Sequence, residues 1–452
     1  MVKYFIFVVM LIMIIYMMKG GLKMIHILFQ NLILLLFLSF FFEFSFMSFN
    51  FFDFSSLQYF YGLDYFSFWM IILSMWVIVL MMLASGSVVK MNKFLYLFVV
   101  NLLIMLLFLI FAFSVLNFFL FYFFFEASLI PTMLLVLGWG YQIERVNAVM
   151  YMIMYTMFFS FPFLVGILYV FYDFGSVDII LLGEMKIEID FSYFYYLMTN
   201  IFFVKMPMFS IHGWLPKAHV EAPVAGSMIL AGVMLKLGGY GLYRILFIFE
   251  DCWFDNNLSY LIFSLVGGVY LSFVCIWQVD MKAMVAYSSV VHMSLVIGGL
   301  LSLGLIGVHG AFMMMLAHGL CSSGMFCMVN MIYERTLSRS LVINKGLLIY
   351  SPVMMMMWFF LCVGNMSAPP SLNLISEIFL LISLISVSGW LFILLMVIMF
   401  VNSCYSLYLY SYVCYGGALN WPMFHVFSVR EYMVILMHLV PLNLLIMSIN
   451  FF

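Results

Sequence analysis

The sequence predicts an all-α membrane protein with about 14 transmembrane helices. Two observations predict this class. Of the 452 residues, 68% are hydrophobic and only 8% are charged, and apolar runs long enough to cross a bilayer recur along the whole chain. A water-soluble domain carries about 25% charged residues, so the composition excludes a protein whose surface faces water. The longest polar stretch, residues 172–190, is too short for a domain outside the membrane.

The expected spans follow one another with short connections. In chain order they are 4–18, 25–42, 65–83, 94–113, 116–137, 148–171, 191–211, 224–249, 258–277, 283–303, 306–332, 346–385, 389–412 and 432–450. The twelfth is too long for one crossing and contains Pro369 and Pro370, so we expect it to be a single broken helix.

The charges in the connections separate by sign under this assignment, which supports an even number of crossings. One side collects the basic residues Lys19, Lys23, Lys90, Lys93, Arg145, Lys217, Lys282, Arg335, Arg339, Lys345 and Arg430. The other collects the acidic residues Glu43, Asp53, Asp64, Asp173, Asp178, Glu184, Glu188, Asp190, Glu250, Asp251 and Asp255. Lys3, Lys186 and Arg244 are exceptions. We expect both termini on the acidic side and the matrix or cytoplasm on the basic side.

Four ionisable residues remain inside the spans: Glu126, Lys205, Lys236 and Glu377. A charge at the centre of a membrane helix costs roughly 2.5 to 3.5 kcal/mol, so such residues are rare without a polar partner or a functional path. Lys236 lies 13 residues after Pro223 and 13 before Phe249, which is far from either interface. The structural alternative is that these side chains form fixed internal ion pairs or extend to the interface.

Two of the four lie beside expected helix breaks, which favours a relay of protons. Lys205 precedes Pro207 by two residues, and Glu377 follows the Pro369 and Pro370 pair. Proline frees carbonyl groups that are tolerated at membrane depth only against protein or a hydrated cavity. Burial favours a neutral amine, and a nearby carboxylate favours the ammonium. Moving the carboxylate toward a lysine would therefore make the lysine bind a proton, and moving it away would make the lysine release one.

Histidines extend this relay, because imidazole exchanges protons near neutral pH. His292 and His318 lie in apolar spans beside serines, and His309 is a weaker candidate of the same kind. The alternative for each is a core histidine hydrogen-bonded to a neighbouring helix. His212 and His219, near Glu221, lack a convincing third ligand, so we expect no metal site.

Other sites are not indicated. The seven cysteines show no CxxC spacing and are expected to be small buried hydrophobes rather than cluster ligands. The pair Glu144 and Arg145 is expected to be solvated or to contact another subunit. No Gly-rich nucleotide loop and no basic face for nucleic acid is present in the sequence.

Several strings resemble a known family. They include FFVKMPMFSIHGWLPKAHVEAPVAGSMILAGVMLKLGGYGLYR at 202–244, FFFEASLIPTMLLVLGWG at 123–140, AYSSVVHMS at 286–294, LAHGLCSSGMF at 316–326, YERTLSR at 333–339 and GNMSAPPSLNLISEI at 364–378. These are similar to the antiporter-like membrane-arm subunits of respiratory complex I, the proton-pumping NADH:ubiquinone oxidoreductase, and among them to the chain 4 family. The first ninety residues match more weakly.

The resemblance implies a fourteen-helix fold with two inverted five-helix repeats, each containing a broken helix. The implied division is amino-terminal helices at 1–90, a first repeat at 91–250, a second at 251–415 and a carboxy-terminal helix at 416–452. By the same resemblance, Glu126 matches the carboxylate of the fifth helix, and Lys205 and Lys236 match the lysines of the broken seventh and of the eighth. His292 and His318 match relay positions of helices ten and eleven, and Glu377 matches the exit-side carboxylate of the twelfth.

The resemblance also implies the setting. NADH, FMN, iron–sulfur clusters and ubiquinone are expected in other subunits, with no cofactor bound by this chain. The expected partners are other membrane-arm subunits, especially neighbouring antiporter-like chains, and membrane lipids. The abundance of Phe, Met, Ile and Tyr favours the mitochondrial inner membrane, with the basic connections in the matrix and both termini on the intermembrane-space side.

Two other functions remain open on the sequence. One is a cation/proton antiporter subunit, although sodium coupling calls for more membrane carboxylates than the two found. The other is a passive scaffold that ties membrane subunits together, in which case the buried lysines serve packing alone.

Overall fold

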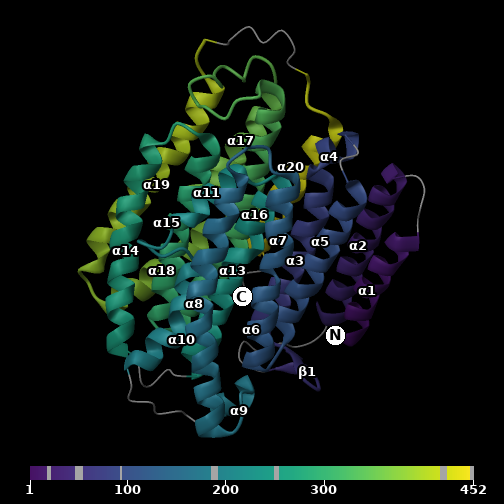
Figure 1. The fold of residues 1–452 in the computed structure, drawn as a ribbon. Coiled ribbons are helices and arrows are strands. Elements are labelled where there is room, and N and C mark those ends of the chain that lie inside the picture. The colour runs from purple at the N-terminus through teal and green to yellow at the C-terminus, as the bar shows by residue number, and fades with distance from the viewer. Residues whose placement is uncertain are drawn as a thin grey trace. The chain divides into compact units, whose positions relative to one another are not determined.

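The computed structural model describes residues 1–17, 22–45, 54–91, 94–184, 192–248, 254–417 and 425–447, and these are almost all helical (Figure 1). Helices suit an apolar chain because each satisfies its own backbone hydrogen bonds where water is absent. Some residues used in the sequence predictions lie outside the described residues: Lys19, Asp53, Lys93, Lys186, Glu188, Asp190, Glu250, Asp251 and Cys252.

The chain divides into two compact units. Unit 1 comprises Met1–Phe202 and Glu221–Cys252, and unit 2 comprises Phe203–Val220 and Trp253–Phe452. Unit 1 contains α1 (Val2–Met17), α2 (Leu22–Ser45), β1 (Ser55–Gln58), β2 (Tyr61–Leu63), α3 (Tyr65–Ala84), α4 (Gly86–Met91), α5 (Leu95–Ser114), α6 (Phe118–Ala127), α7 (Leu129–Trp139), α8 (Arg145–Phe174), α9 (Ile179–Glu184), most of α10 (Ser192–Lys205), α12 (Val224–Ile229), the π-helix η1 (Leu230–Met234) and α13 (Leu235–Ile248). The two strands form one short antiparallel hairpin.

The core of unit 1 lies along α3 and the continuous run α12, η1 and α13. Every residue in the most apolar window of that run is buried, as are most of those in α3. Asp64 begins α3 with a capping box, in which its side chain accepts from Ser67 N at 3.0 Å. Gly241 permits close packing, because a Cβ there would overlap the Phe202 ring of α10.

Unit 2 holds the last residues of α10 and most of α11, followed by seven longer helices. The first of these, α11, spans Trp214–Glu221, and the seven longer helices are α14 (Phe254–Trp277), α15 (Met281–Leu301), α16 (Leu305–Thr336), α17 (Pro352–Asn365), α18 (Leu372–Val387), α19 (Leu391–Cys414) and α20 (Val429–Leu444). The core lies along α15 and α16, in whose most apolar windows nearly every residue is buried. Gly310 of α16 lets α18 approach, since a Cβ there would lie 3.0 Å from Leu380 N.

Within the described residues, 11 helices are long and apolar enough to cross a membrane. The first, seventh and twelfth expected spans are not among them. Shorter apolar helices cover the first and the twelfth: Val2–Ile15, Pro352–Asn365 and Leu372–Val387. The seventh corresponds to α10, of 14 residues. The expected break in the twelfth span is present between α17 and α18, whereas the count of fourteen crossings stays a prediction.

Candidate functional site

The polar ends of all six residues predicted from the sequence are buried. Lys205, Lys236, His292, His318 and Glu377 are at most 2% exposed. Glu126 is partly exposed as a residue, yet both of its carboxylate oxygens are buried. Glu126 and Lys236 belong to unit 1, and the other four belong to unit 2.

Lys236 follows an irregular turn of its own helix. The five-residue π-helix η1 ends two residues before it, and such single wide turns occur often at functional sites. The Lys236 side chain leans toward the start of the helix and its Nζ donates to the carbonyl of Ala231 within η1. The wide turn therefore supplies a backbone acceptor to an amine in the fully buried core of unit 1.

Glu126 lies at a helix junction that the sequence analysis did not predict. The expected span 116–137 is divided into α6 and α7 at Ser128, two residues after Glu126. Pro131 has no N–H, so the carbonyl of Ala127 lacks its usual helical donor. Asn101 of α5 donates to the Pro131 carbonyl at 2.9 Å. The signal in the sequence was Pro131 itself.

Unit 1 also contains a buried ion pair that sequence reasoning missed. Arg244 Nη2 lies 2.6 Å from Asp64 Oδ1, with the two side chains 5% and 1% exposed. The same Nη2 donates to the Tyr240 hydroxyl at 2.9 Å, and that hydroxyl donates to the Phe113 carbonyl at 3.0 Å. Arg244, an exception to the charge pattern, is thus neutralised by an acidic residue expected in a connection. Its position eight residues after Lys236 in one apolar helix was the available signal.

In unit 2 the structure brings three predicted residues together. His292 Nδ1 of α15 lies 3.5 Å from Glu377 Oε1 of α18, and the rings of His292 and His318 of α16 are 5.4 Å apart. The Ser367 hydroxyl, in the break before α18, donates to Glu377 Oε2. Within the described part of the chain, His292 Nε2 and Glu377 Oε1 have no hydrogen-bond partner.

The serines beside these histidines donate to backbone carbonyls of their own helices. Ser288, Ser289 and Ser294 donate to carbonyls of α15 three residues earlier, at 2.6 to 2.8 Å. Ser322 donates to the His318 carbonyl at 2.6 Å. Such bonds satisfy a hydroxyl in an apolar setting without another helix. These hydroxyl protons are therefore engaged by the local backbone.

Lys205 is the last residue of α10, and the helix gives way to turns before α11 begins at Trp214. Trp214 Nε1 donates to the Val204 carbonyl at 3.1 Å, which satisfies a group left open by the break. The break expected at Pro207 is therefore present. All four charged residues named from the sequence adjoin a helix irregularity, where the sequence had indicated only two.

His212 and His219 are placed among aromatic rings. His212 stacks on Phe209 with ring centroids 5.8 Å apart, and desolvation lowers its pKa. His219 stacks on Phe326 of α16 at 4.5 Å. Among the described residues, no group of three His, Cys, Asp or Glu side chains could hold a metal ion.

Lys282 corrects the assignment of charges to connections. It was expected in a connection on the basic side, but it lies in the first turn of α15 and is only 2% exposed. Five of the six described cysteines are buried.

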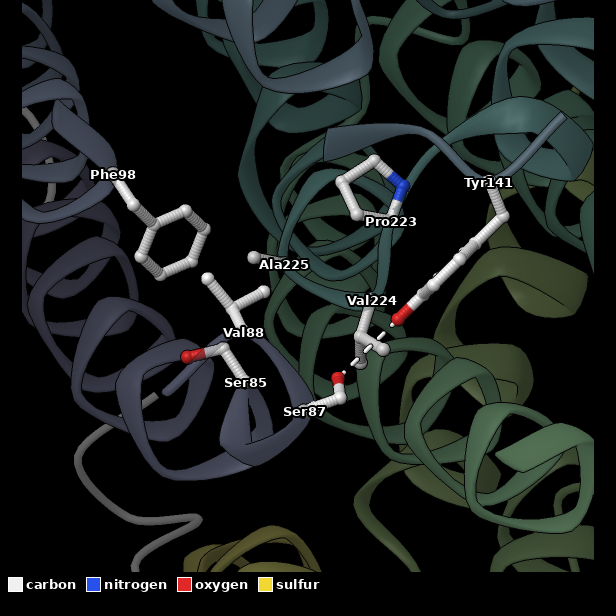
Figure 2. A pocket seen from close by; sticks show the side chains of 8 residues that line it. All are labelled: Ser85, Ser87, Val88, Phe98, Tyr141, Pro223, Val224 and Ala225. Carbon is white, nitrogen blue, oxygen red and sulfur yellow. Dashed lines mark hydrogen bonds between the residues drawn. The ribbon is translucent and has the colours of Figure 1, made fainter. Parts of the chain in front are cut away.

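A small pocket in unit 1 is separate from these residues. Figure 2 shows it between the end of α3, Tyr141 and the start of α12, with the Ser87 and Tyr141 hydroxyls 3.3 Å apart. Its remaining lining is mostly apolar and includes Val88 and Phe98. None of the six nominated residues lines it.

Comparisons with known proteins agree on one family. The family described as "NADH-ubiquinone oxidoreductase chain 4, amino terminus" matches residues 1–112, and "NADH:quinone oxidoreductase/Mrp antiporter, TM" matches residues 116–403. The first ninety residues, which carry no quoted motif, are thus included. NADH-ubiquinone oxidoreductase chain 4 of Ceratitis capitata is 47% identical over 396 residues, 87% of this chain and 88% of the relative. That of Aedes aegypti is 47% identical over 399 residues, 88% and 89% of the two chains.

A solved structure shares the fold. A chain of respiratory complex I from Thermus thermophilus with bound NADH aligns over 99% of this chain and 96% of its own length, with a TM-score of 0.87 and 20% sequence identity.

Proposed function

The chain belongs to the NADH-ubiquinone oxidoreductase chain 4 family, and from this premise we propose that its buried lysines, carboxylates and histidines carry protons across the membrane. It is an antiporter-like membrane-arm subunit of respiratory complex I, the proton-pumping NADH:ubiquinone oxidoreductase, and a multi-pass protein of the mitochondrial inner membrane. The proposed route comprises Glu126, Lys205, Lys236, His292, His318 and Glu377.

One observation carries the proposal: every charged residue of this set lies beside an irregular piece of helix. Irregular backbone at membrane depth is tolerated where it meets protein or lines a water-filled cavity. Ionisable groups there mark ion paths more often than packing contacts.

The chemistry differs between the two units. In unit 2, His292 and Glu377 lie close enough for a proton to pass between them through a short contact or one water molecule. His318 extends this pair along α16. In unit 1, Lys236 is the group whose charge changes as a proton arrives or leaves, since burial favours the neutral amine. Driving force comes from electron transfer between NADH and ubiquinone elsewhere in the complex.

The cofactors and partners follow from the family. We propose that NADH, FMN, the iron–sulfur clusters and ubiquinone bind other subunits and that this chain binds none of them. Its partners are other membrane-arm subunits, in particular neighbouring antiporter-like chains, together with membrane lipids.

The finer architecture is also proposed. It comprises fourteen crossings, two inverted five-helix repeats at 91–250 and 251–415, the basic connections in the matrix and both termini in the intermembrane space. The shorter helices support the count, because Val2–Ile15 supplies the first crossing, α10 supplies the seventh, and Pro352–Asn365 and Leu372–Val387 share the broken twelfth. The breaks after Lys205 and before Glu377 support the repeats, since each proposed repeat then contains a span interrupted by non-helical turns.

The substitution Lys236→Met tests the proposal. Methionine keeps the length of the side chain but cannot carry a proton, so we expect an assembled complex whose pumping falls about tenfold or more, with slower quinone reduction through coupling. Proton uptake by the complex in vesicles measures this. Lys90→Met, at an exposed lysine of α4, is the matched control and leaves pumping unchanged.

The alternatives predict other outcomes. A passive scaffold predicts normal pumping by assembled Lys236→Met, which would refute the proposal. A cation/proton antiporter predicts sodium-dependent transport without NADH, which we expect to be absent.

A further inference from the structure

The ion pair of Asp64 and Arg244 ties three helices together at one end of unit 1. Asp64 caps the first turn of α3, and Arg244 lies in α13, four residues before that helix ends at Ile248. The Tyr240 hydroxyl joins the pair to the Phe113 carbonyl, which belongs to the last turn of α5. The side chains involved are at most 5% exposed. The start of α3 and the ends of α5 and α13 are therefore held at the same level by buried polar bonds.

The guanidinium lies on the same side of α13 as Lys236. Lys236, Tyr240 and Arg244 follow one another at intervals of four residues, so they lie along one side of the helix. Arg244 is about 12 Å beyond Lys236 along the helix axis. Helical side chains lean toward the start of their helix, and the guanidinium reaches back to the Tyr240 hydroxyl at 2.9 Å. It therefore lies between Lys236 and the end of unit 1 at which α3 begins.

Aromatic rings enclose the guanidinium. Its central carbon lies 4.6 Å from the ring centroid of Tyr240, 4.9 Å from that of Phe54 and 5.4 Å from that of Tyr243. The ring of Phe66 in α3 stacks on that of Tyr243, with centroids 4.8 Å apart. Rings around a cation stabilise its charge. They also leave little room for a chain of water molecules to pass the guanidinium.

The charge at this position is permanent. A guanidinium stays protonated in proteins, and it has five N–H donors and no acceptor. A water molecule that binds it therefore turns its oxygen toward the N–H groups and cannot accept a proton from that side. Arg244 Nε and Asp64 Oδ2 have no hydrogen-bond partner among the described residues, so each can bind one water in addition to the pair. The pair itself is favourable only while both groups are ionised, so neither member suits the transfer of protons.

We infer that Arg244, held by Asp64 and Tyr240, is a proton barrier that closes the end of unit 1 beyond Lys236. Channels use a fixed arginine in the same way to exclude protons and cations from a pore. Asp64 belongs to the acidic set of connections, so the closed end is the one proposed to face the intermembrane space. The barrier prevents protons on that side from returning to Lys236. The inference rests on the proposed function, and it adds a group that excludes protons to the groups that carry them.

The combination of Asp64→Asn with Arg244→Gln in the assembled complex tests the inference. The two amides can bond to each other without a charge, so this variant removes the cation while keeping polar contact between α3 and α13. Vesicles that contain the complex are given a pH gradient without NADH, and the decay of the gradient is followed with a pH-sensitive dye. After subtraction of the decay in vesicles without the complex, we expect proton leak to be about tenfold faster or more than in the wild type. A tenfold change requires the barrier to fall by only about 1.4 kcal/mol.

A third substitution shows whether the leak passes through the proposed route. Adding Lys236→Met to the double variant removes the proton carrier next to the barrier, so we expect the leak to return to the wild-type rate. The matched control is Arg335→Gln with Glu431→Gln. It removes the ion pair between α16 and α20, whose atoms are 2.7 Å apart and whose side chains are 8% and 9% exposed. This pair lies outside the proposed route, so its loss should leave the vesicles tight to protons.

The outcomes separate the barrier from the fold and from the proposed function. A fast leak that Lys236→Met abolishes supports the barrier. A leak that persists after Lys236→Met, or that the control variant shares, overturns it, because a loosened fold then explains the leak.

Tight vesicles with the double variant also overturn the barrier, and the proposed function still stands if Lys236→Met alone stops pumping. Normal pumping by Lys236→Met overturns the proposed function, whatever the leak. If the double variant does not assemble, Asp64→Asn with Arg244→Met decides by the same measurements, since apolar side chains can replace a buried ion pair without loss of stability.

Discussion

Removing one partner of the Asp64 and Arg244 ion pair should destabilise unit 1 far more than removing both. The two side chains are 1% and 5% exposed, so neither remaining charge could reach water. Breaking a buried pair in this way costs about 3 to 5 kcal/mol, whereas an ordinary hydrogen bond contributes about 1 kcal/mol. Asp64→Asn isolates the charge, because asparagine caps a helix about as well as aspartate and can keep the bond from Ser67 N.

The experiment is a double-mutant cycle with Asp64→Asn, Arg244→Gln and the combination. We expect each single variant to lose most assembled complex and the double variant to recover much of it, since two amides of similar size can bond without a net charge. The measurements are the amount of intact complex in the membrane and the temperature at which NADH oxidation is half inactivated. The reasoning fails if the double variant loses as much as the two single variants combined.

Two further predictions concern unit 2 and the packing of α13. Glu377→Gln keeps the size of the side chain and can still accept from Ser367, but it cannot bind and release a proton. Pumping by the assembled complex should therefore fall about tenfold or more in a vesicle assay. An unchanged rate would remove Glu377 from the proposed route. Gly241→Val should lower the yield of intact complex on a native gel, because the valine side chain would overlap Phe202 and overpacking costs about 1 to 3 kcal/mol. The control is Gly138→Val, because there is open space around Gly138.

Prolines and isolated charges were informative in the sequence because their effects are local. A proline removes a donor wherever it stands, so the breaks at Pro207 and before Glu377 could be predicted without knowledge of the neighbouring helices. A lysine such as Lys236 in a long apolar run is costly in any packing arrangement. The break at Ser128 had the same kind of signal in Pro131, and the length of the apolar run concealed it.

Other features depend on contacts between distant parts of the chain. Asp64 and Arg244 are 180 positions apart, and nothing in either local sequence indicates the partner. The approach of His292 to Glu377 depends on how α15 packs on α18. The π-helix at Leu230–Met234 has no proline and no distinctive composition, since a wide turn arises from the fit of the helix to its neighbours. These features can be recognised only in the folded structure.

The buried charges fall into two kinds according to what their partners allow. Arg244 is matched to a carboxylate, and this arrangement is favourable only while both groups stay ionised. Lys236 donates to the Ala231 carbonyl, which accepts from an ammonium and from a neutral amine alike. Glu377 is met by the Ser367 hydroxyl, which can donate to a carboxylate or accept from a carboxylic acid. The Ala231 carbonyl and the Ser367 hydroxyl thus tolerate both protonation states of the groups they contact, as the proposed route requires, while the Asp64 and Arg244 pair holds one state and serves the fold.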